Sequence, residues 1–337
     1  MAKSTGDKLL NEILEGGRAR LASTIEGQRE CIPTGSLLLD HHFCGGFMVG
    51  QLTELYGKPT SGKSLICNQA AAQVTQDGDA VIYYDGDSNH QNKQSNAWRE
   101  KHGIVLENLY QVDPYTSAEV VMNTIDDLRE ALGARCKLVI IDSVGELVTE
   151  KALGKKAGEA LVSDRAKLLW EWLRKVRATN RHAAFVFINQ EVAKIGSYLG
   201  GNTTPGGDAL KFFCHQRIRL KGTELCDSAN PKAGAYGIKI TAEAKKLKGE
   251  VPKLVPFEVF FDYNDMKFDV PEEVLEVAIA HGLLEAKPPF YTMEFQGQPL
   301  KIKGRENFKN YMTQENVALY DYLKKAIFEP IPGTEGS

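Results

Sequence analysis

Eight consecutive residues have the types and spacing of a phosphate-binding loop. They fit the pattern G-x-x-x-x-G-K-[ST], in which the glycines let backbone amide groups turn toward phosphate oxygens. The loop comprises Gly57, Lys58, Pro59, Thr60, Ser61, Gly62, Lys63 and Ser64. Lys63 can reach the β- and γ-phosphates of a nucleotide, and the Ser64 hydroxyl can bind Mg²⁺. The spacing therefore predicts a site for ATP with Mg²⁺.

Three further side chains are candidates for the rest of this site. Asp142 follows the apolar run 137–141, and a carboxylate at the tip of a neighbouring strand can order Mg²⁺, usually through water. Asp87 follows the run 80–84 on what would be the same edge of the sheet. It is the candidate base for the attacking water, and the alternative is a solvated loop carboxylate. Trp98 could stack on adenine, or it could be an ordinary core residue.

The elements that would position these side chains are indicated by apolar runs in alternation with helical stretches. Strand-like runs are found at 52–56, 80–84, 138–141 and 184–188, with helical patterns at 64–75 and 163–179. Such alternation predicts an α/β fold with a mostly parallel central sheet and helices on both faces. The runs 216–221, 237–242 and 256–261 follow one another too closely for crossover helices, so we expect antiparallel strands at one side.

The first part of the chain differs from the alternating pattern that follows it. Its apolar positions have helical spacing, at Leu9, Leu10, Ile13 and Leu14. We expect residues 1–30 to form a helical arm that contacts another subunit, ahead of a core domain that spans residues 31–268.

The pattern changes again after residue 268. A helix is predicted at 272–281, followed by a hairpin-like stretch at 290–300 and two helical runs. Residues 269–337 are therefore expected to form a small C-terminal α/β domain with a flexible end. Within the core, glycine-containing or polar stretches predict loops at 152–161, 191–207 and 223–234.

The overall composition limits the classes of protein to which the chain can belong. It is ordinary for a soluble globular protein, with 42% hydrophobic and 25% charged residues among 337. No apolar run approaches the roughly 20 residues of a membrane span, and the N-terminus is too polar for a signal peptide. Six cysteines without a CxxC pair predict reduced thiols in a cytoplasmic protein rather than a zinc site. Because the net charge is −3, binding to nucleic acid would need a local basic surface.

Stretches on both sides of the phosphate loop show a resemblance to a known family. Before the loop are the segments 32–40 (IPTGSLLLD) and 45–52 (GGFMVGQL). After it, F-I-N-Q at 187–190 leads into a glycine-rich loop and then GGDALKF at 206–212. Together these stretches resemble the RecA-type homologous recombinases, close to bacterial RecA and to phage UvsX-like recombinases, and the resemblance covers about residues 30–327.

This resemblance implies a RecA-type P-loop ATPase core in which two loops, at about 152–162 and 191–207, bind DNA. Gln190 would sense the γ-phosphate and pass its state to the second loop; alternatively, its amide bonds to the backbone. Asp87 stands where the family has a catalytic glutamate, and Trp98 stands where it stacks a tyrosine on adenine. A shorter carboxylate would lie farther from the water, which puts the rate of hydrolysis in question.

The family also implies an ATP site shared between neighbouring subunits, with two lysines reaching in from the neighbour. Lys246 and Lys248 have the matching spacing, and they would stabilise charge on the γ-phosphoryl group. The alternative is a solvated lysine run. Lys211 and Phe212 match a segment of the family's subunit interface. Hydrolysis would then depend on filament assembly.

The expected DNA contacts are to the phosphate backbone, because the base edges must stay free for pairing. The candidate residues are Arg165, Lys167, Arg174, Lys194, Gly206 and Gly207. Ile195 matches the apolar wedge that the family inserts between base triplets, although it could instead pack beneath the loop.

These features predict an ATP-dependent DNA recombinase that hydrolyses ATP to ADP and phosphate. It would form helical filaments on single-stranded DNA and exchange strands with homologous duplex DNA. Single-strand-binding and mediator proteins are further expected partners. The lack of a long acidic tail favours a phage-encoded member, acting in the host cytoplasm. The alternatives are a RecA-fold motor of another class, such as a helicase or repair ATPase, and a nucleotide-switched scaffold without hydrolysis.

Overall fold

The computed structural model describes residues 30–87, 93–155, 162–193, 202–227, 234–248 and 257–328. Contacts divide the chain into two units, Met1–Glu30 and Cys31–Ser337. The predicted N-terminal arm, with Leu9, Leu10, Ile13 and Leu14, lies outside the described residues. The elements described below all belong to the second unit.

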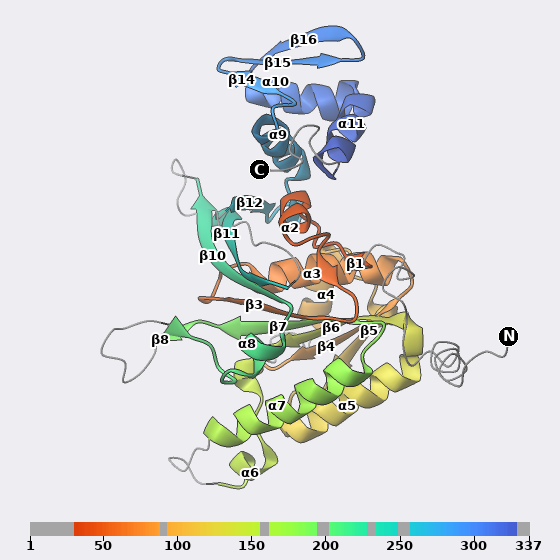
Figure 1. Cartoon of the computed structure of the whole chain (residues 1–337), viewed down its shortest axis with the longest axis vertical. Coiled ribbons are helices and arrows are strands. Elements are labelled where there is room, and N and C mark those ends of the chain that lie inside the picture. Colours follow the sequence, from red (N-terminus) through yellow and green to blue (C-terminus); the bar gives the residue numbers. More distant parts are fainter. Residues whose placement is uncertain are drawn as a thin grey trace, which may run out of the picture. The chain divides into compact units, whose positions relative to one another are not determined.

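A nine-stranded sheet forms the centre of this unit, with the strand order β13-β12-β11-β10-β3-β7-β6-β4-β5 (Figure 1). Its strands are β3 (Leu52–Gly57), β4 (Ala80–Asp85), β5 (Leu109–Val112), β6 (Cys136–Asp142), β7 (Ala184–Gln190), β10 (Gln216–Cys226), β11 (Ala235–Leu247), β12 (Phe257–Asp262) and β13 (Lys267–Phe268). Strands β10 to β5 pair in parallel, and β11 to β13 add antiparallel pairs at one side. The predicted α/β fold with a mostly parallel sheet is confirmed.

Strand β10 departs from the prediction in its direction. The sequence predicts an antiparallel strand at 216–221, but β10 pairs in parallel with β3 and antiparallel only with β11. The chain reaches β10 from the end of β7 through residues 191–215, which include the short helix α8 (Ala209–Phe213). This connection is long enough to cross over, which a parallel pair requires.

The predicted loops contain more regular structure than the sequence indicates. Helix α6 (Glu150–Leu153) overlaps the first of them, and β8 (Val192–Ala193) pairs with β9 (Asn202–Thr203) inside the second. The third prediction, a loop at 223–234, begins too early, because β10 continues to Cys226, whereas its end agrees with the start of β11 at Ala235. Past the end of β3 these two strands stay paired with each other.

Helices cover both faces of the sheet, because successive side chains of a buried strand point to opposite sides. In β4, Val81 and Tyr83 belong to the core cluster that contains α3, whereas Ile82 and Tyr84 belong to the cluster that contains α5, α7 and α8. Figure 1 shows α5 and α7 together on the side away from α3. The longer helices of the core are α3 (Lys63–Gln76), α4 (Lys93–Lys101), α5 (Ala118–Leu132) and α7 (Val162–Thr179).

The region after residue 268 has a small sheet of its own. Three antiparallel strands, β14 to β16, form where the sequence predicts a hairpin. The elements are α9 (Val270–Ala280), β14 (Glu285–Lys287), β15 (Phe290–Phe295), β16 (Gln298–Lys303), α10 (Arg305–Asn310) and α11 (Val317–Phe328). Helix α9 contacts α2 (Leu37–His42). In the sequence, α2 follows β1 (Cys31–Ile32) and precedes β2 (Phe47–Met48), and these two strands pair with each other. The domain boundary at 268 stays a prediction.

The six cysteines all lie within the described residues. All six are free, and Cys67, Cys136 and Cys214 are buried. Across the ranges given above, no helix has both the length and the apolar character needed to cross a membrane.

Candidate nucleotide and nucleic-acid sites

The phosphate loop connects the end of β3 to the start of α3, as its spacing predicts. Gly62 has φ 85°, in the left-handed region that favours glycine. Gly57 approaches β10 so closely that an added Cβ would lie 2.2 Å from the carbonyl oxygen of Leu220. The amino end of α3 follows directly at Lys63, so its partial positive charge adds to that of the loop amides.

Lys63 is a buried cation, and within the described part of the chain its Nζ donates hydrogen bonds to neutral oxygens. Its side chain is 8% exposed, and Nζ donates to the Lys58 carbonyl at 2.8 Å and to Ser61 Oγ at 3.2 Å. Burial lowers the pKa of Lys63, while the carboxylates of Asp142 and Asp87 act in the opposite direction. Because neutral oxygens do not offset the buried positive charge, an anionic phosphate would be stabilised here.

Asp142 meets the first turn of α3 from the end of β6. Ser64 Oγ donates to Asp142 Oδ2 at 2.6 Å, and Tyr83 Oη donates to the same oxygen at 3.4 Å. Burial raises the pKa of Asp142 to about 6, and the nearby Asp85 and Asp87 also raise it. Oxygen ligands and concentrated negative charge suit Mg²⁺. Among the described residues, no three His, Cys, Asp or Glu side chains converge as a metal site.

Asp87 and Gln190 lie on the same edge of the sheet as the loop. Asp87 is exposed just past β4, near enough to Lys63 and Asp142 to affect the pKa of both. Gln190 ends β7 opposite Gly57 in the strand register, and the next backbone amide donates to the Gly57 carbonyl at 3.0 Å. The structure therefore brings Lys63, Asp142, Asp87 and Gln190 together.

A pocket of about 460 Å³ opens beside the first turn of α3. It is lined by Leu65, Trp98, Lys101, Tyr263, Asn264, Asp265 and Met266. Trp98 is half-buried and its ring lies edge-on to His102, with ring centroids 4.2 Å apart. Two aromatic side chains, Trp98 and Tyr263, thus border a space next to the phosphate loop. Tyr263 was missed from sequence, because it belongs to a polar turn after β12 with no motif around it.

Asn189 was also missed as a functional candidate, although it lies inside the F-I-N-Q stretch. It is fully buried, and its Nδ2 donates to Glu54 Oε1 at 3.1 Å and to the Pro205 carbonyl at 2.9 Å. Pro205 is near the end of the predicted second DNA loop and Asn189 is just before its beginning. One side chain therefore holds both ends of this loop to the sheet.

The predicted DNA-contacting residues on α7 lie on two faces of this helix, and Gly206 and Gly207 pack against the helix beside one of them. Arg165 Nη1 donates to the Gly145 carbonyl, and Gly206 and Gly207 lie against Leu169 and Ala166 of the same helix end. Gly206 has φ 92° and Gly207 has φ 68°. The other candidates, Lys167 and Arg174, are both exposed and lie on a different face of the helix from Arg165. Lys194 and Ile195 lie outside the described residues.

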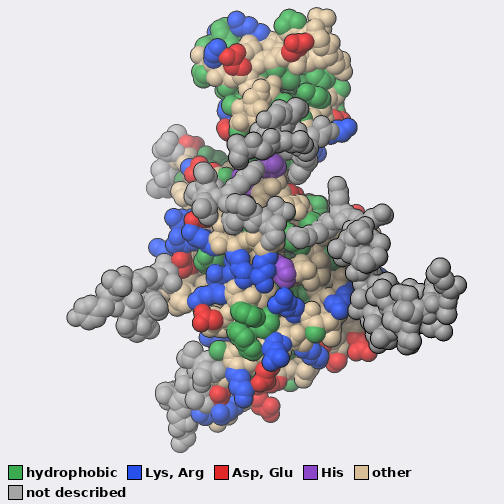
Figure 2. Space-filling view, viewed as in Figure 1, with side chains coloured by type: hydrophobic (Ala, Val, Ile, Leu, Met, Phe, Trp, Pro, Cys, Tyr) green, Lys and Arg blue, Asp and Glu red, His purple; other side chains and the backbone are tan. Residues whose placement is uncertain are grey.

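Lys246 and Lys248 lie far from the phosphate loop of their own subunit. In the strand register, Lys246 of β11 lies opposite Arg217 of β10, and Arg217 lies opposite Glu54, near the amino end of β3. The phosphate loop instead follows the carboxyl end of β3. Lys246 Nζ donates to the Lys211 carbonyl at 2.6 Å. Burial lowers the pKa of Lys246, and so do neighbouring cations that include Lys248. Figure 2 shows Lys and Arg side chains in a band across the face drawn, near β10 and α8. The chain therefore has a local basic surface of the kind that binding to nucleic acid would require despite the net charge of −3.

Comparisons with known proteins agree with this geometry. A family model described as the RecA N-terminal domain matches residues 10–262. Protein RecA of Aquifex aeolicus (strain VF5) is 29% identical over 321 residues, 94% of this chain and 88% of that protein. Protein RecA of Lactobacillus johnsonii is 29% identical over 96% of this chain and 86% of its own length. Protein RecA of Acidothermus cellulolyticus is 27% identical over 94% and 88%.

Proposed function

This chain belongs to the RecA family, and we propose that it is an ATP-dependent DNA recombinase that acts as a filament on single-stranded DNA. It pairs the bound strand with homologous duplex DNA and exchanges strands in recombination and repair. It hydrolyses ATP to ADP and phosphate in a DNA-dependent manner. The observation that carries the proposal is the position of Gln190, beside the phosphate loop and directly ahead of the predicted second DNA loop.

The phosphates are held by the loop amides, the amino end of α3 and Lys63. The adenine lies in the pocket between Trp98 and Tyr263, where aromatic faces favour stacking. Mg²⁺ would be held by the Ser64 hydroxyl and, through water, by Asp142, and it would neutralise charge on the β- and γ-phosphates. The residues present fit this ion, since all their donors are oxygens.

Asp87 is proposed to orient the attacking water and accept its proton. Its carboxylate is exposed at the edge where the γ-phosphate would lie, close to the Lys63 ammonium. The neighbouring Asp142 is more deeply placed and is engaged by Ser64, so it suits the metal rather than the water.

Gln190 is proposed to report the state of the nucleotide to DNA. An amide at this strand end can bond to a γ-phosphate on one side. Its movement would displace β8 and the residues that follow it, because β8 begins two residues later. Asn189 holds the base of the loop through Glu54 and Pro205, so a displacement of Gln190 would move the loop rather than detach it.

The active site is proposed to be shared between two subunits. Lys246 and Lys248 lie toward the amino end of β3, so within one subunit they are at the opposite edge from the phosphate loop. In a head-to-tail assembly that edge faces the carboxyl edge of the next subunit, where the two lysines would stabilise charge on the γ-phosphoryl group.

Exposed apolar side chains support self-assembly of this kind. Phe212 on α8 is 56% exposed, Val148 just before α6 is 41% exposed, and Leu153, the last residue of α6, is 58% exposed. Two different patches on one chain can pair between neighbouring copies, and such a heterologous contact that does not close yields a helical filament. Phe212 packs against Trp170 with the two rings tilted by 31° and their centroids 5.2 Å apart, which restricts the orientation of the exposed ring.

The proposal is tested by measuring ATP turnover with and without unstructured single-stranded DNA, together with strand exchange into a homologous duplex. We expect DNA to stimulate turnover and the wild-type chain to exchange strands. Lys63→Ala and Lys248→Ala should each lower DNA-dependent turnover about 10²- to 10³-fold, the scale of losing a preorganised charge at phosphate.

Mixing the two inactive variants tests whether the site is shared. Some interfaces in a mixed filament place an intact Lys63 loop against an intact Lys248, so part of the turnover should return. A mixture that stays inactive, while each variant still binds DNA, would contradict the shared site. Turnover that is independent of DNA, without strand exchange, would point to another RecA-fold motor.

A further inference from the structure

Helix α4 carries an arginine that is almost completely buried. The Arg99 side chain is 2% exposed and is among the largest fully buried side chains of the described residues. A buried guanidinium costs free energy unless charged and polar partners surround it. Burial lowers the pKa of Arg99, and the neighbouring Tyr83 and Asp85 act in the opposite direction. The position therefore depends on specific partners.

Among the described residues, the partners of the Arg99 side chain lie on β4 and β5, the last two strands at one side of the central sheet. Nη1 donates to Gln111 Oε1 on β5 at 2.9 Å, and Nη2 is 4.0 Å from Asp85 Oδ2 on β4. The guanidinium carbon is 5.3 Å from the centroid of the Tyr83 ring. Tyr83 and Gln111 are direct neighbours in the register of β4 and β5. One side chain thus fastens α4 to both strands.

The same contacts connect the two ends of the nucleotide site. On the strand side, Tyr83 Oη donates to Asp142 Oδ2 at 3.4 Å, so the ring under Arg99 also touches the carboxylate beside Ser64. On the helix side, the residue before Arg99 is Trp98, a wall of the 460 Å³ pocket. Arg99 and Tyr83 therefore connect the pocket wall at Trp98 to the Asp142 carboxylate beside Ser64.

We propose that Arg99 is a positioning residue for nucleotide binding: it holds α4 on β4 and β5 so that Trp98 faces the base. This inference rests on the proposed function, since it assumes that the pocket takes the adenine. Arg99 itself touches no nucleotide. Its loss would let α4 shift on the sheet, which weakens contact with the base while leaving the phosphate loop, built from β3 and α3, in place.

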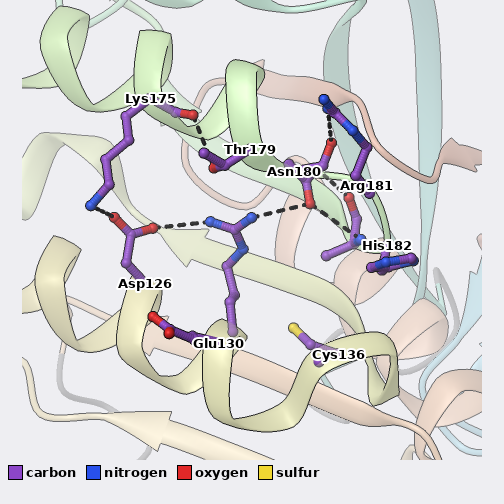
Figure 3. A pocket seen from close by; sticks show the side chains of 11 residues that line it. Asp126, Glu130, Cys136, Lys175, Thr179, Asn180, Arg181 and His182 are labelled. Atoms are coloured by element: carbon purple, nitrogen blue, oxygen red, sulfur yellow. Dashed lines mark hydrogen bonds and ion pairs between the residues drawn. The ribbon is translucent and has the colours of Figure 1, made fainter. Parts of the chain in front are cut away.

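The chain provides a matched control in Arg129 on α5, whose partners Asp126 and Asn180 are labelled in Figure 3. Arg129 Nη1 donates to Asp126 Oδ1 at 3.0 Å and Nη2 donates to Asn180 Oδ1 at 3.4 Å. Its guanidinium carbon lies 5.0 Å from the centroid of the Phe185 ring. Arg129 therefore has the same three kinds of partner as Arg99, namely a carboxylate, an amide and an aromatic ring. It lies near the amino ends of the sheet strands, whereas Arg99 lies near the carboxyl ends of β4 and β5.

The experiment compares two double variants that each remove one arginine together with the side-chain amide that accepts from it, so that both change the net charge by the same amount. They are Arg99→Met with Gln111→Leu, and Arg129→Met with Asn180→Leu. For each full-length protein, affinities for ADP and for inorganic pyrophosphate, both with Mg²⁺, are measured by titration calorimetry. Pyrophosphate occupies the phosphate loop without a base, so the pair of probes separates base binding from phosphate binding.

In the Arg99 double variant, ADP affinity is expected to fall about tenfold, the scale of losing one base–aromatic stack, with pyrophosphate affinity changed less than about twofold. The Arg129 double variant should bind both probes like the wild type. Unchanged ADP affinity in the Arg99 variant, or an equal loss for both probes, would overturn the proposal. A wild-type chain that binds neither probe would instead contradict the proposed function.

Arg99→Lys provides a second variant if the double variant does not fold. Lysine keeps the positive charge beside Asp85, but it cannot span Asp85 and Gln111 in the way a planar guanidinium does. We expect ADP affinity to fall about threefold, with pyrophosphate affinity unchanged. A lysine variant that binds ADP as tightly as the wild type would show that the fork of Arg99 has no part in positioning the base wall.

Discussion

Charged side chains gather at both edges of the central sheet, but the partners of these charges differ between the phosphate site and the groove at the opposite edge. At the amino edge, a groove of about 340 Å³ lies between α5 and α7 (Figure 3). There Asp126 accepts from Arg129 and is 2.9 Å from Lys175 Nζ, and Arg129 also reaches Asn180. Asn180 in turn donates to the Ala183 carbonyl at 2.6 Å. Every charge in this set has an opposite charge or an amide beside it.

At the carboxyl edge the charges are arranged in the opposite way. Lys63 is bonded to neutral oxygens, and Asp142 has Asp85 and Asp87 as negative neighbours. Such an arrangement is unfavourable in the protein alone and becomes favourable when phosphate and a divalent cation complete it. The comparison indicates that unmatched buried charge, rather than charge or concavity by itself, distinguishes the ligand site from the structural network.

The largest expected effect that tests this comparison comes from equivalent changes to one carboxylate at each edge. Asp142→Asn should lower DNA-dependent ATP turnover about 10²-fold, because it removes the charge that orders Mg²⁺. Asp126→Asn should leave turnover within about twofold of wild type, because its partners are all protein groups. Steady-state phosphate release at saturating single-stranded DNA measures both. If Asp126→Asn lowered turnover as much as Asp142→Asn, the amino-edge groove would have to take part in ligand binding.

The same two substitutions should have opposite effects on stability. The pKa of Asp142 is raised to about 6, so above that pH the folded chain carries a buried charge that an asparagine removes, and stability should rise by about 1 kcal/mol. Asp126→Asn leaves Arg129 without its carboxylate and should cost about 1–2 kcal/mol. Denaturant unfolding at pH 7.5 without nucleotide gives both values. Loss of stability in Asp142→Asn would show that this carboxylate is structural.

The residues at the phosphate end of the site could be predicted from sequence because the fold leaves them little freedom. Lys63 and Ser64 are fixed by the loop itself. Asp142 and Gln190 end parallel strands, and the carboxyl ends of such strands meet at one edge of the sheet. For Asp142 the prediction needed only the strand pattern, whereas for Gln190 it came from the resemblance to the recombinase family.

The residues at the base end could not be predicted in the same way, because they depend on long-range pairing. Tyr263 reaches the pocket only because β12 pairs with β11 and β11 with β10. Arg99 reads as a surface residue on a polar helix, and its burial follows from Asp85 and Gln111 on two separate strands. The direction of β10 was missed for a related reason, since the length of the crossover decides it and local pattern does not.

The smallest expected effect tests whether a raised carboxyl pKa is sufficient by itself to identify a ligand site. Glu273 on α9 is 3% exposed, and its carboxylate accepts from Ser36 Oγ at 2.9 Å and from the Leu38 amide at 3.1 Å. Burial raises the pKa of Glu273 to about 8, and burial raises that of nearby Asp40 to about 7. Both lie at the contact between α2 and α9, where protein groups donate hydrogen bonds to them.

For a carboxyl group whose folded pKa lies above its unfolded value of 4.5, stability is fully present below pH 4.5 and is lost as the pH rises through 8. The free energy of unfolding of the wild type should therefore decrease between pH 5 and 8, by on the order of 1–2 kcal/mol. Glu273→Gln should flatten this slope while ADP affinity stays at the wild-type value, and Asp40→Asn provides the control for the part due to Asp40. Weaker ADP binding in Glu273→Gln would mean that the α2–α9 contact is coupled to the nucleotide site, and that matched hydrogen bonds do not suffice to identify a purely structural carboxylate.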